Sequence, residues 1–315
     1  MSNPASGRRV PVSLIVAACG VLPGCMSQHK PDLVVPVVPQ VAPPTAEQIA
    51  RVYNTRVEGL RRLWSRLEMK FTGTDAQGKP IDEESEGFFI TEPPFRLSMS
   101  VNKLGEAYFL LGSNQERYWW FDLSRPERPA YVGLHANATP EKTVKVGLPV
   151  HPLELLELVA CTPITPDAPD TPAISTAWAT DAPPIAGRTL VVVTSPTRWG
   201  VRRVYVDPSD GNAHRVVLAD EQGRTLVESE LSRYEPVAGT QAAVATVITL
   251  RLAPSGRGTL TVRMTLYGME DRDLNPALFD LEEQKSRRDV RKVFDLDGPS
   301  PAVEVGDWPS TESPR

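Results

Sequence analysis

Residues 95–111 read FRLSMSVNKLGEAYFLL. Apolar and polar residues alternate up to Val101, and this period of two predicts a half-buried β-strand. Residues 102–106, Asn-Lys-Leu-Gly-Glu, then supply a tight turn, after which apolar residues resume at Ala107. The segment therefore predicts an antiparallel hairpin.

Similar short segments occur on both sides of this hairpin. Leu67, Met69 and Phe71 alternate with polar residues before it. Further strands are predicted around Phe89 and at 118–122, 189–194, 202–207, 215–220, 225–234, 244–252 and 259–267. About eleven strands result, and an antiparallel sheet of that size must curl or close. We expect a mainly β protein built on one large curved antiparallel sheet, or incomplete β-barrel.

Two helices are predicted beside the strands. Thr45 and Gln48 have the spacing of a capping box, and apolar residues from Ile49 to Leu67 recur at steps of three and four. A second, short helix is predicted at 153–160, after two prolines. We expect both helices to cover the concave face of the sheet, which gives an α+β class.

The first 25 residues have the anatomy of a secretory signal. Arg8 and Arg9 precede a short apolar segment, which ends in Gly24 and Cys25. A cysteine directly after a small residue at this place resembles the bacterial lipobox, in which the thiol receives acyl chains such as palmitate. We expect residues 1–24 to be removed and Cys25 to carry the lipid. Cys19 is the alternative, and an ordinary signal peptide or a buried N-terminal segment would leave neither cysteine acylated.

Proline-rich segments mark the expected domain borders. Residues 25–44 predict a tether, which at about 3.1 Å per residue reaches up to ~60 Å. The folded domain is expected at 45–281, with a proline-rich insertion loop at 162–187. Residues 282–315 are expected to form a charged helix and a loose tail.

Composition excludes some functions. The net charge of −5 over 315 residues argues against a nucleic-acid-binding surface. No apolar run reaches the ~18–20 residues that a membrane-spanning helix needs. Cys161 lies far from the two N-terminal cysteines and is expected to be a buried, unpaired thiol.

No catalytic or metal-binding constellation is predicted. His151 and Glu154 would lie one turn apart on a helix, but no third ligand accompanies them, and capping is the expected role of His151. Glu83, Glu84 and Glu86 are expected to form a solvated strand edge rather than an acid/base pair. The remaining histidines are scattered along the chain: His29, His135 and His214. No cofactor is expected.

The densest aromatic run is residues 118–121, Tyr-Trp-Trp-Phe. On a strand, Trp119 and Phe121 share one face and Trp120 lies on the other. Core packing is one interpretation of these rings, and a cavity wall that faces an apolar ligand is the other.

The order of lipobox, tether, amphipathic helix and two groups of strands resembles the outer-membrane lipoprotein-sorting (LolA/LolB) superfamily. Residues 95–100, 103–105 and 107–111 resemble the strand and hairpin of that family, and Leu104-Gly105 matches an exposed leucine that the LolB branch carries there. Residues 202–207 and 273–279 are similar to a late strand and an Asn-Pro at the end of the sheet. The resemblance covers about 45–280, and the loop at 162–187 is an insertion relative to it.

This resemblance implies an incomplete barrel whose concave side is an apolar cavity for acyl chains. It implies that Leu104 is a hydrophobic hook that reaches a membrane or a partner. It needs no catalytic group, because burying each methylene contributes ~0.8 kcal/mol. The residues expected around the cavity are Val52, Leu60, Leu63, Trp64, Met69, Phe71, Leu97, Met99, Trp119 and Phe121.

The leading hypothesis is a monomeric, lipid-anchored envelope protein that faces the periplasm, at the outer membrane rather than the inner. It would bind a lipid or an acylated protein in its half-barrel, as in lipoprotein transport. A structural or protein-interaction lipoprotein with the same fold and no ligand is the alternative, and an enzyme is the third hypothesis. An open cavity would favour the first hypothesis, and one filled by Trp119, Phe121 or Met99 would favour the second.

Overall fold

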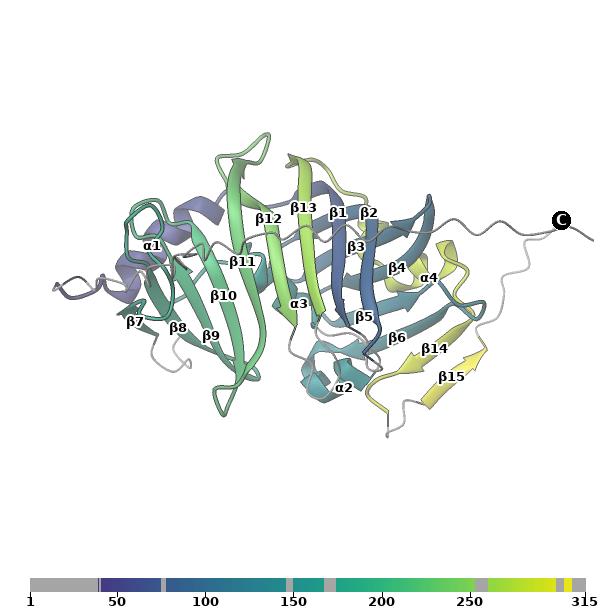
Figure 1. Cartoon of the computed structure of the whole chain (residues 1–315). Coiled ribbons are helices and arrows are strands. Elements are labelled where there is room, and N and C mark those ends of the chain that lie inside the picture. The colour runs from purple at the N-terminus through teal and green to yellow at the C-terminus, as the bar shows by residue number, and fades with distance from the viewer. Residues whose placement is uncertain are drawn as a thin grey trace, which may run out of the picture. The chain divides into compact units, whose positions relative to one another are not determined.

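The computed structural model describes residues 39, 41–74, 78–145, 150–166, 174–252, 260–298 and 303–307. These residues build one 15-stranded sheet, in the order β15-β14-β6-β5-β4-β3-β2-β1-β13-β12-β11-β10-β9-β8-β7 (Figure 1). The two edges, β7 and β15, are not joined to each other, so the sheet is open. The predicted fold class, a large curved sheet with helices on its concave face, is confirmed, with more strands than the eleven expected.

The strand and helix bounds are as follows. The strands are β1 Leu63–Thr74, β2 Pro80–Glu92, β3 Arg96–Lys103, β4 Glu106–Ser113, β5 Arg117–Asp122, β6 Pro129–Leu134, β7 Ser175–Trp178, β8 Val191–Thr197, β9 Gly200–Val206, β10 Ala213–Asp220, β11 Thr225–Pro236, β12 Ala243–Leu252, β13 Leu260–Glu270, β14 Lys292–Asp295 and β15 Val303–Asp307. The helices are α1 Ala46–Val57, α2 Pro140–Lys145, α3 Pro152–Leu158 and α4 Leu281–Arg287, with 3-10 turns η1 His135–Asn137 and η2 Pro276–Phe279.

The β3–β4 hairpin forms where the alternation predicted it. Met99 pairs with Leu111 across the two strands, and both side chains are buried. Leu104 and Gly105 occupy the turn with φ of 53° and 82°, which is the pair of positive values that a two-residue type I′ turn requires. Glycine adopts this conformation freely, whereas Leu104 adopts it at a cost.

The four strands that were not predicted are the short ones, β6, β7, β14 and β15. Strands of four to six residues carry too few alternations to be distinguished from loops. β14 lies in the segment expected as a charged helix and loose tail. It pairs in parallel with β6, while every other pairing between the described strands is antiparallel. The C-terminal segment therefore extends the sheet.

Helix α1 begins at the predicted capping box, where the Thr45 hydroxyl accepts from the Gln48 N–H and the Gln48 side chain accepts from the Thr45 N–H. It ends at Val57, ten residues before the predicted end at Leu67, because the chain turns at Glu58 and Gly59. Spacing of four between Leu63 and Leu67 fits a helix as well as a strand, and here these residues belong to β1.

The concave face is covered by α1 and α3. Tyr53 of α1 donates its hydroxyl to the Thr162 carbonyl just after α3, at 3.1 Å. Arg56 donates to the carbonyls of Ala160 and Ala243, at 2.8 and 3.0 Å. These buried contacts join α1, the end of α3 and β12 into the main core.

The sheet is curved enough to bring distant strands together. The β8–β9 turn carries Arg198, which donates to the carbonyls of His135 and Ala136 just after β6. Trp199 of the same turn donates its ring N–H to the Ala138 carbonyl at 3.1 Å. Because β6 and β9 are separated by nine strands in the sheet order, these contacts require the two wings of the sheet to fold toward each other.

A second hydrophobic cluster occupies the opposite, convex face. Trp119 and Phe121 of β5 pack there with Leu281 of α4 and Val293 of β14. Gly112 is required beside them, because a Cβ at this position would stand 2.3 Å from the Trp119 ring. The C-terminal segment therefore covers the outer side of β4 to β6.

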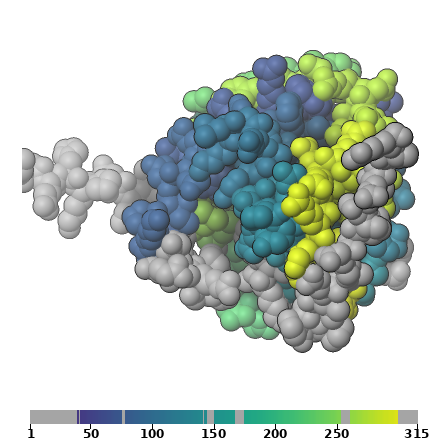
Figure 2. All heavy atoms as spheres, turned by 90° about the vertical axis from the view of Figure 1, so that its right-hand side faces the viewer, coloured from purple at the N-terminus to yellow at the C-terminus, as the bar shows by residue number. Residues whose placement is uncertain are grey.

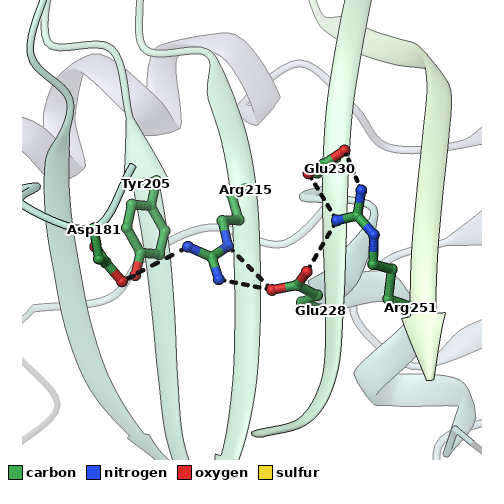
Figure 3. A network of polar contacts seen from close by, with 6 residues as sticks. All are labelled: Asp181, Tyr205, Arg215, Glu228, Glu230 and Arg251. Atoms are coloured by element: carbon green, nitrogen blue, oxygen red, sulfur yellow. Dashed lines mark hydrogen bonds and ion pairs between the residues drawn. The ribbon is translucent and has the colours of Figure 1, made fainter. Parts of the chain in front are cut away.

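A chain of ion pairs crosses the convex face farther along the sheet (Figure 3). Arg215 of β10 donates to Glu228 of β11 at 2.7 Å, and Arg251 of β12 donates to both Glu228 and Glu230. Asp181 accepts from the Tyr205 hydroxyl at 2.7 Å. Asp181 also pairs with Arg215 at 3.6 Å, so these contacts tie the neighbouring strands β9 to β12 and the loop that contains Asp181 to one another.

Candidate functional site

An apolar cavity of about 390 Å³ opens on the concave side of the sheet. Its walls come from β1 to β5 on one side and from β12 and β13 on the other, with α3 at one end. In Figure 2 a hollow lies between blue and teal segments, and green atoms of the later strands are visible inside it. The apolar lining consists of Met69, Phe71, Ile81, Met99, Val101, Tyr108, Phe109, Leu111, Trp120, Val150, Leu155, Leu250, Leu252, Leu260, Val262 and Met264.

Burial increases from one end of the cavity to the other. Along β13, Leu260 is half-buried, Val262 is buried, and Met264 is only 1% exposed. The deep end is closed by Val150 and by Leu155 of α3, both buried. The shallow end lies where β2 begins and where β3 and β12 end. We call this end the entrance and the deep end at α3 the floor.

Charged residues lie on the β2–β3 side of the entrance. Glu83 and Lys103 form an ion pair at 2.8 Å, and both side chains are about half exposed. The hydrogen bond that Lys103 donates to Glu83 raises the pKa of Lys103. The entrance therefore presents paired charges to solvent, while the interior presents hydrocarbon.

Three methionines line the cavity: Met69, Met99 and Met264. Methionine is unbranched and flexible, so it adapts its shape to different apolar partners. A methionine-rich wall fits a ligand recognised by its bulk and hydrophobicity rather than by polar contacts.

Polar groups with shifted ionisation lie beside the floor, at the start of α3. The His151 side chain caps the helix by accepting from the Leu153 N–H, and a carboxyl oxygen of Glu154 accepts from the backbone N–H of His151. His135 Nε2 lies 2.8 Å from the Asn114 carbonyl and therefore carries a proton, so its Nδ1 accepts from His151 Nε2 at 3.3 Å. Both rings are thus neutral in this arrangement.

Burial controls the ionisation of this group. Desolvation, followed by the charges of His135 and Arg198, lowers the pKa of His151 to about 3. Desolvation raises the pKa of Glu154 to about 8, and it also raises the pKa of Glu157. None of these three side chains lines the cavity. They hold α3 in place and do not point to a reaction within the cavity.

The structure brings three of the expected cavity residues to the cavity: Met69, Phe71 and Met99. Leu60, Leu63 and Leu97 are buried in the main core away from it. Val52 is half-buried on α1. The other three expected residues lie elsewhere, and the reason is the alternation of the strands.

Trp64, Trp119 and Phe121 lie on the convex face. Trp64 stacks there against Arg272 and contacts Phe88, and the two β5 residues belong to the second cluster. Trp120, one position away from both, lines the cavity instead. The sequence separated the two faces of β5 correctly but gave no indication of which one was concave.

Other cavity residues were not anticipated. Phe109 and Trp120 are in ring contact at 5.2 Å on neighbouring strands. Leu155 comes from α3, while Leu250 and Met264 come from the second group of strands. Alternation in β12 and β13 was visible in the sequence, but the pairing of β13 with β1, which places both groups around one cavity, joins residues almost 200 positions apart.

Leu104 is 97% exposed at the tip of the β3–β4 turn, next to Lys103 at the entrance. Tyr108, across the hairpin, is 47% exposed and lines the cavity. Cys19 and Cys25 lie outside the described residues. Cys161 is buried, and burial raises the pKa of its thiol to about 12.

Within the described ranges, no three His, Cys, Asp or Glu side chains gather closely enough to hold a metal ion. No helix in that part of the chain is long and apolar enough to cross a bilayer.

The fold is similar to those of solved structures with little sequence identity. A LolA superfamily protein from Nitrosomonas europaea shares 11% identity over 76% of this chain and 99% of that chain, with a TM-score of 0.47. A structure described as an outer membrane lipoprotein-sorting protein domain, from Vibrio parahaemolyticus, shares 12% over 75% and 96%, with a TM-score of 0.49. A DUF1329 family protein from Desulfovibrio piger shares 10% over 75% and 95%, with a TM-score of 0.50.

These likenesses concern the fold alone. Of these three, the Desulfovibrio piger protein, at a TM-score of 0.50, shares the fold of this chain. No protein-family model matches the sequence, and no curated protein matches it either.

Proposed function

We propose that the protein binds the acyl chain of a lipid or of a lipidated protein in the concave cavity, as an envelope protein that faces the periplasm. The observation that carries this proposal is the cavity itself, which is lined by hydrocarbon, closed at α3 and rimmed by paired charges. Each methylene transferred into it contributes ~0.8 kcal/mol, so a long chain binds without specific polar contacts. The LolA-like fold supports this function.

The test is the binding of a fluorescent fatty acid to the soluble chain that begins at residue 26. Saturable binding at one site, competed by unlabelled palmitate, is expected. Absence of binding would reject the proposal.

The alternative, a scaffold without a ligand, is disfavoured by the position of the aromatic side chains. Trp119 and Phe121 pack on the convex face, and Met99 lines the cavity without filling it.

An enzyme is disfavoured because the two histidine and glutamate side chains with large pKa shifts, His151 and Glu154, lie outside the cavity lining. Lys103, whose pKa is raised, does line the cavity, but it is paired with Glu83 and about half exposed.

Lipid anchoring at Cys25 is part of the proposal. The segment that joins Cys25 to α1 reaches the folded domain at its β7 edge. There Trp178 donates to the Val41 carbonyl and Thr176 donates to the Pro44 carbonyl, both at 2.7 Å. A clickable fatty acid fed to cells should label the wild-type protein and fail to label Cys25→Ser. Label that persists in Cys25→Ser and is lost in Cys19→Ser would assign the anchor to Cys19.

Leu104 is proposed to contact the membrane when the ligand enters or leaves. It is fully exposed beside the entrance, and one buried leucine contributes ~1.5–3 kcal/mol of local affinity. Leu104→Glu should slow the transfer of a fluorescent fatty acid from the protein to vesicles by about tenfold or more, with unchanged binding affinity and thermal stability. Val41→Glu, at another exposed apolar residue, should transfer at the wild-type rate. Equal rates for Leu104→Glu and wild type would contradict the role.

A further inference from the structure

We propose that the cavity holds a single linear acyl chain and limits its length, with α3 as the stop. This inference rests on the proposed function and narrows its ligand to one class, amphiphiles with one alkyl chain. It excludes diacyl and triacyl groups as ligands held entirely within the cavity.

The volume sets the number of chains. An apolar cavity of about 150 Å³ in another protein accommodates benzene, which has six carbons. At the same ratio, the 390 Å³ of this cavity accommodates about 15 carbons. One chain of the length of palmitate fills it, and a second chain would have to remain outside.

The gradient of burial sets the direction of the chain. Leu260 and Met264 are about 13 Å apart along β13, at ~3.3 Å per residue. The Leu260 side chain is half-buried and the Met264 side chain is fully buried. The Glu83–Lys103 pair stands at the upper end in contact with solvent. A polar head group therefore stays at this rim, while the methyl end points toward Leu155.

The floor is held at both ends, which makes it a fixed stop. At the start of α3, His151 is hydrogen-bonded to His135 at 3.3 Å. At its end, the Ser229 hydroxyl of β11 donates to the Leu158 carbonyl at 2.6 Å. Arg56 of α1 donates to the next turn at the Ala160 carbonyl. A longer chain would have to displace α3 from contacts with three separate elements.

The experiment measures the affinity of the soluble chain for saturated n-alkanoates of 8 to 20 carbons, by displacement of a fluorescent fatty acid. Affinity should rise about fourfold per methylene, the equivalent of ~0.8 kcal/mol, and stop rising near 14 to 16 carbons. The affinity of lysophosphocholines with the same acyl chains should stop rising at the same chain length, because their head group lies outside the cavity. A dipalmitoyl lipid should bind no more tightly than palmitate.

Variants of α3 test the stop itself. We call the chain length at which affinity stops rising the break. Leu155→Ala enlarges the cavity at its floor, so the break should move to chains two to three carbons longer. Leu155→Phe should move the break to shorter chains. Leu156→Ala is the matched control, because Leu156 is equally buried on the same helix but does not line the cavity. It should lower stability and leave the break unchanged. If Leu155→Ala fails to fold, the Leu155→Phe shift decides.

Affinity that keeps rising up to 20 carbons would overturn the single-chain proposal, and so would tighter binding of the dipalmitoyl lipid than of palmitate. A difference of more than two carbons between the breaks of the alkanoates and of the lysophosphocholines would also overturn it. Equal breaks in the Leu155 and Leu156 variants would also overturn it. In all these cases the proposed function stands, since acyl chains still bind. Failure of every alkanoate and of the fluorescent probe to bind would reject the proposed function, and the chain-length limit with it.

Discussion

Glu154→Gln is expected to gain stability relative to the wild-type protein as the pH rises from 4.5 to 8, by about 1.4 kcal/mol per pH unit. Burial raises the pKa of Glu154 from 4.5 to about 8, so the folded protein keeps a proton that the unfolded chain releases. The stability due to this proton is fully present below pH 4.5 and is lost as the pH rises through 8. Glutamine does not titrate, and its side-chain oxygen still accepts from the His151 N–H.

His151→Asn is the reciprocal variant. Burial lowers the pKa of His151 from 6.5 to about 3, so the unfolded chain binds a proton that the folded protein excludes. The wild-type protein therefore loses stability as the pH falls from 6.5 toward 3. Relative to it, the free energy of unfolding of His151→Asn should rise by about 1.4 kcal/mol for each pH unit over that range. Asparagine retains a side-chain acceptor for the first turn of α3.

The two slopes have opposite signs and cancel in the wild-type protein between pH 4.5 and 6.5. Urea unfolding of the three proteins at pH 4, 5, 6, 7 and 8 gives the free energies to compare. Each variant serves as the control for the other, because each removes one titrating group and keeps the cap. Free energies that run parallel to the wild-type curve at all five pH values would show that neither group titrates differently in the folded and unfolded protein, which would contradict both pKa shifts.

The hairpin at 95–111 illustrates what could be predicted from the sequence. Alternation over Leu97, Met99 and Val101 and the turn at Leu104-Gly105 are local features, and they determine strand, turn and register together. The capping box at Thr45 is equally local and was found in place. The fold class followed from these signals because many short strands with turns between them require a large sheet.

The cavity was harder to predict because its walls come from distant parts of the chain. A period of two separates Trp119 from Trp120, but only the curvature of the sheet decides that Trp120 faces inward. The convex position of Trp119 depends on α4 and β14, which follow it by about 160 to 175 residues. Leu155 belongs to the cavity only because α3 is held across the concave face by residues of other elements.

The end of α1 shows a different limit. Leu63 and Leu67 are spaced as on a helix, yet Ser65 between them is buried and hydrogen-bonded to Tyr267 of β13, as a strand residue that faces inward. A serine offers no hydrophobic signal, so the period of two was not visible at this point. The strand is identified by a contact about 200 residues away.

Filling the deep end of the cavity is expected to abolish acyl binding. Met264 is 1% exposed and lines the cavity on β13. Met264→Trp adds bulk at the deep end of the cavity, and excluding about four methylenes of the chain there would lower affinity by about 100-fold or more at ~0.8 kcal/mol each. Thr265→Trp is the matched control, because the next residue on the strand faces the opposite side of the sheet.

The most direct measurement is therefore a titration of a fluorescent fatty acid into the wild-type protein, Met264→Trp and Thr265→Trp, each first shown by circular dichroism to be folded. Val262→Phe, a smaller change in the same wall, replaces Met264→Trp if tryptophan prevents folding. We expect saturable binding to wild type and Thr265→Trp and a loss of about 100-fold or more in Met264→Trp. Equal affinity for all three proteins would show that the acyl chain does not occupy this cavity.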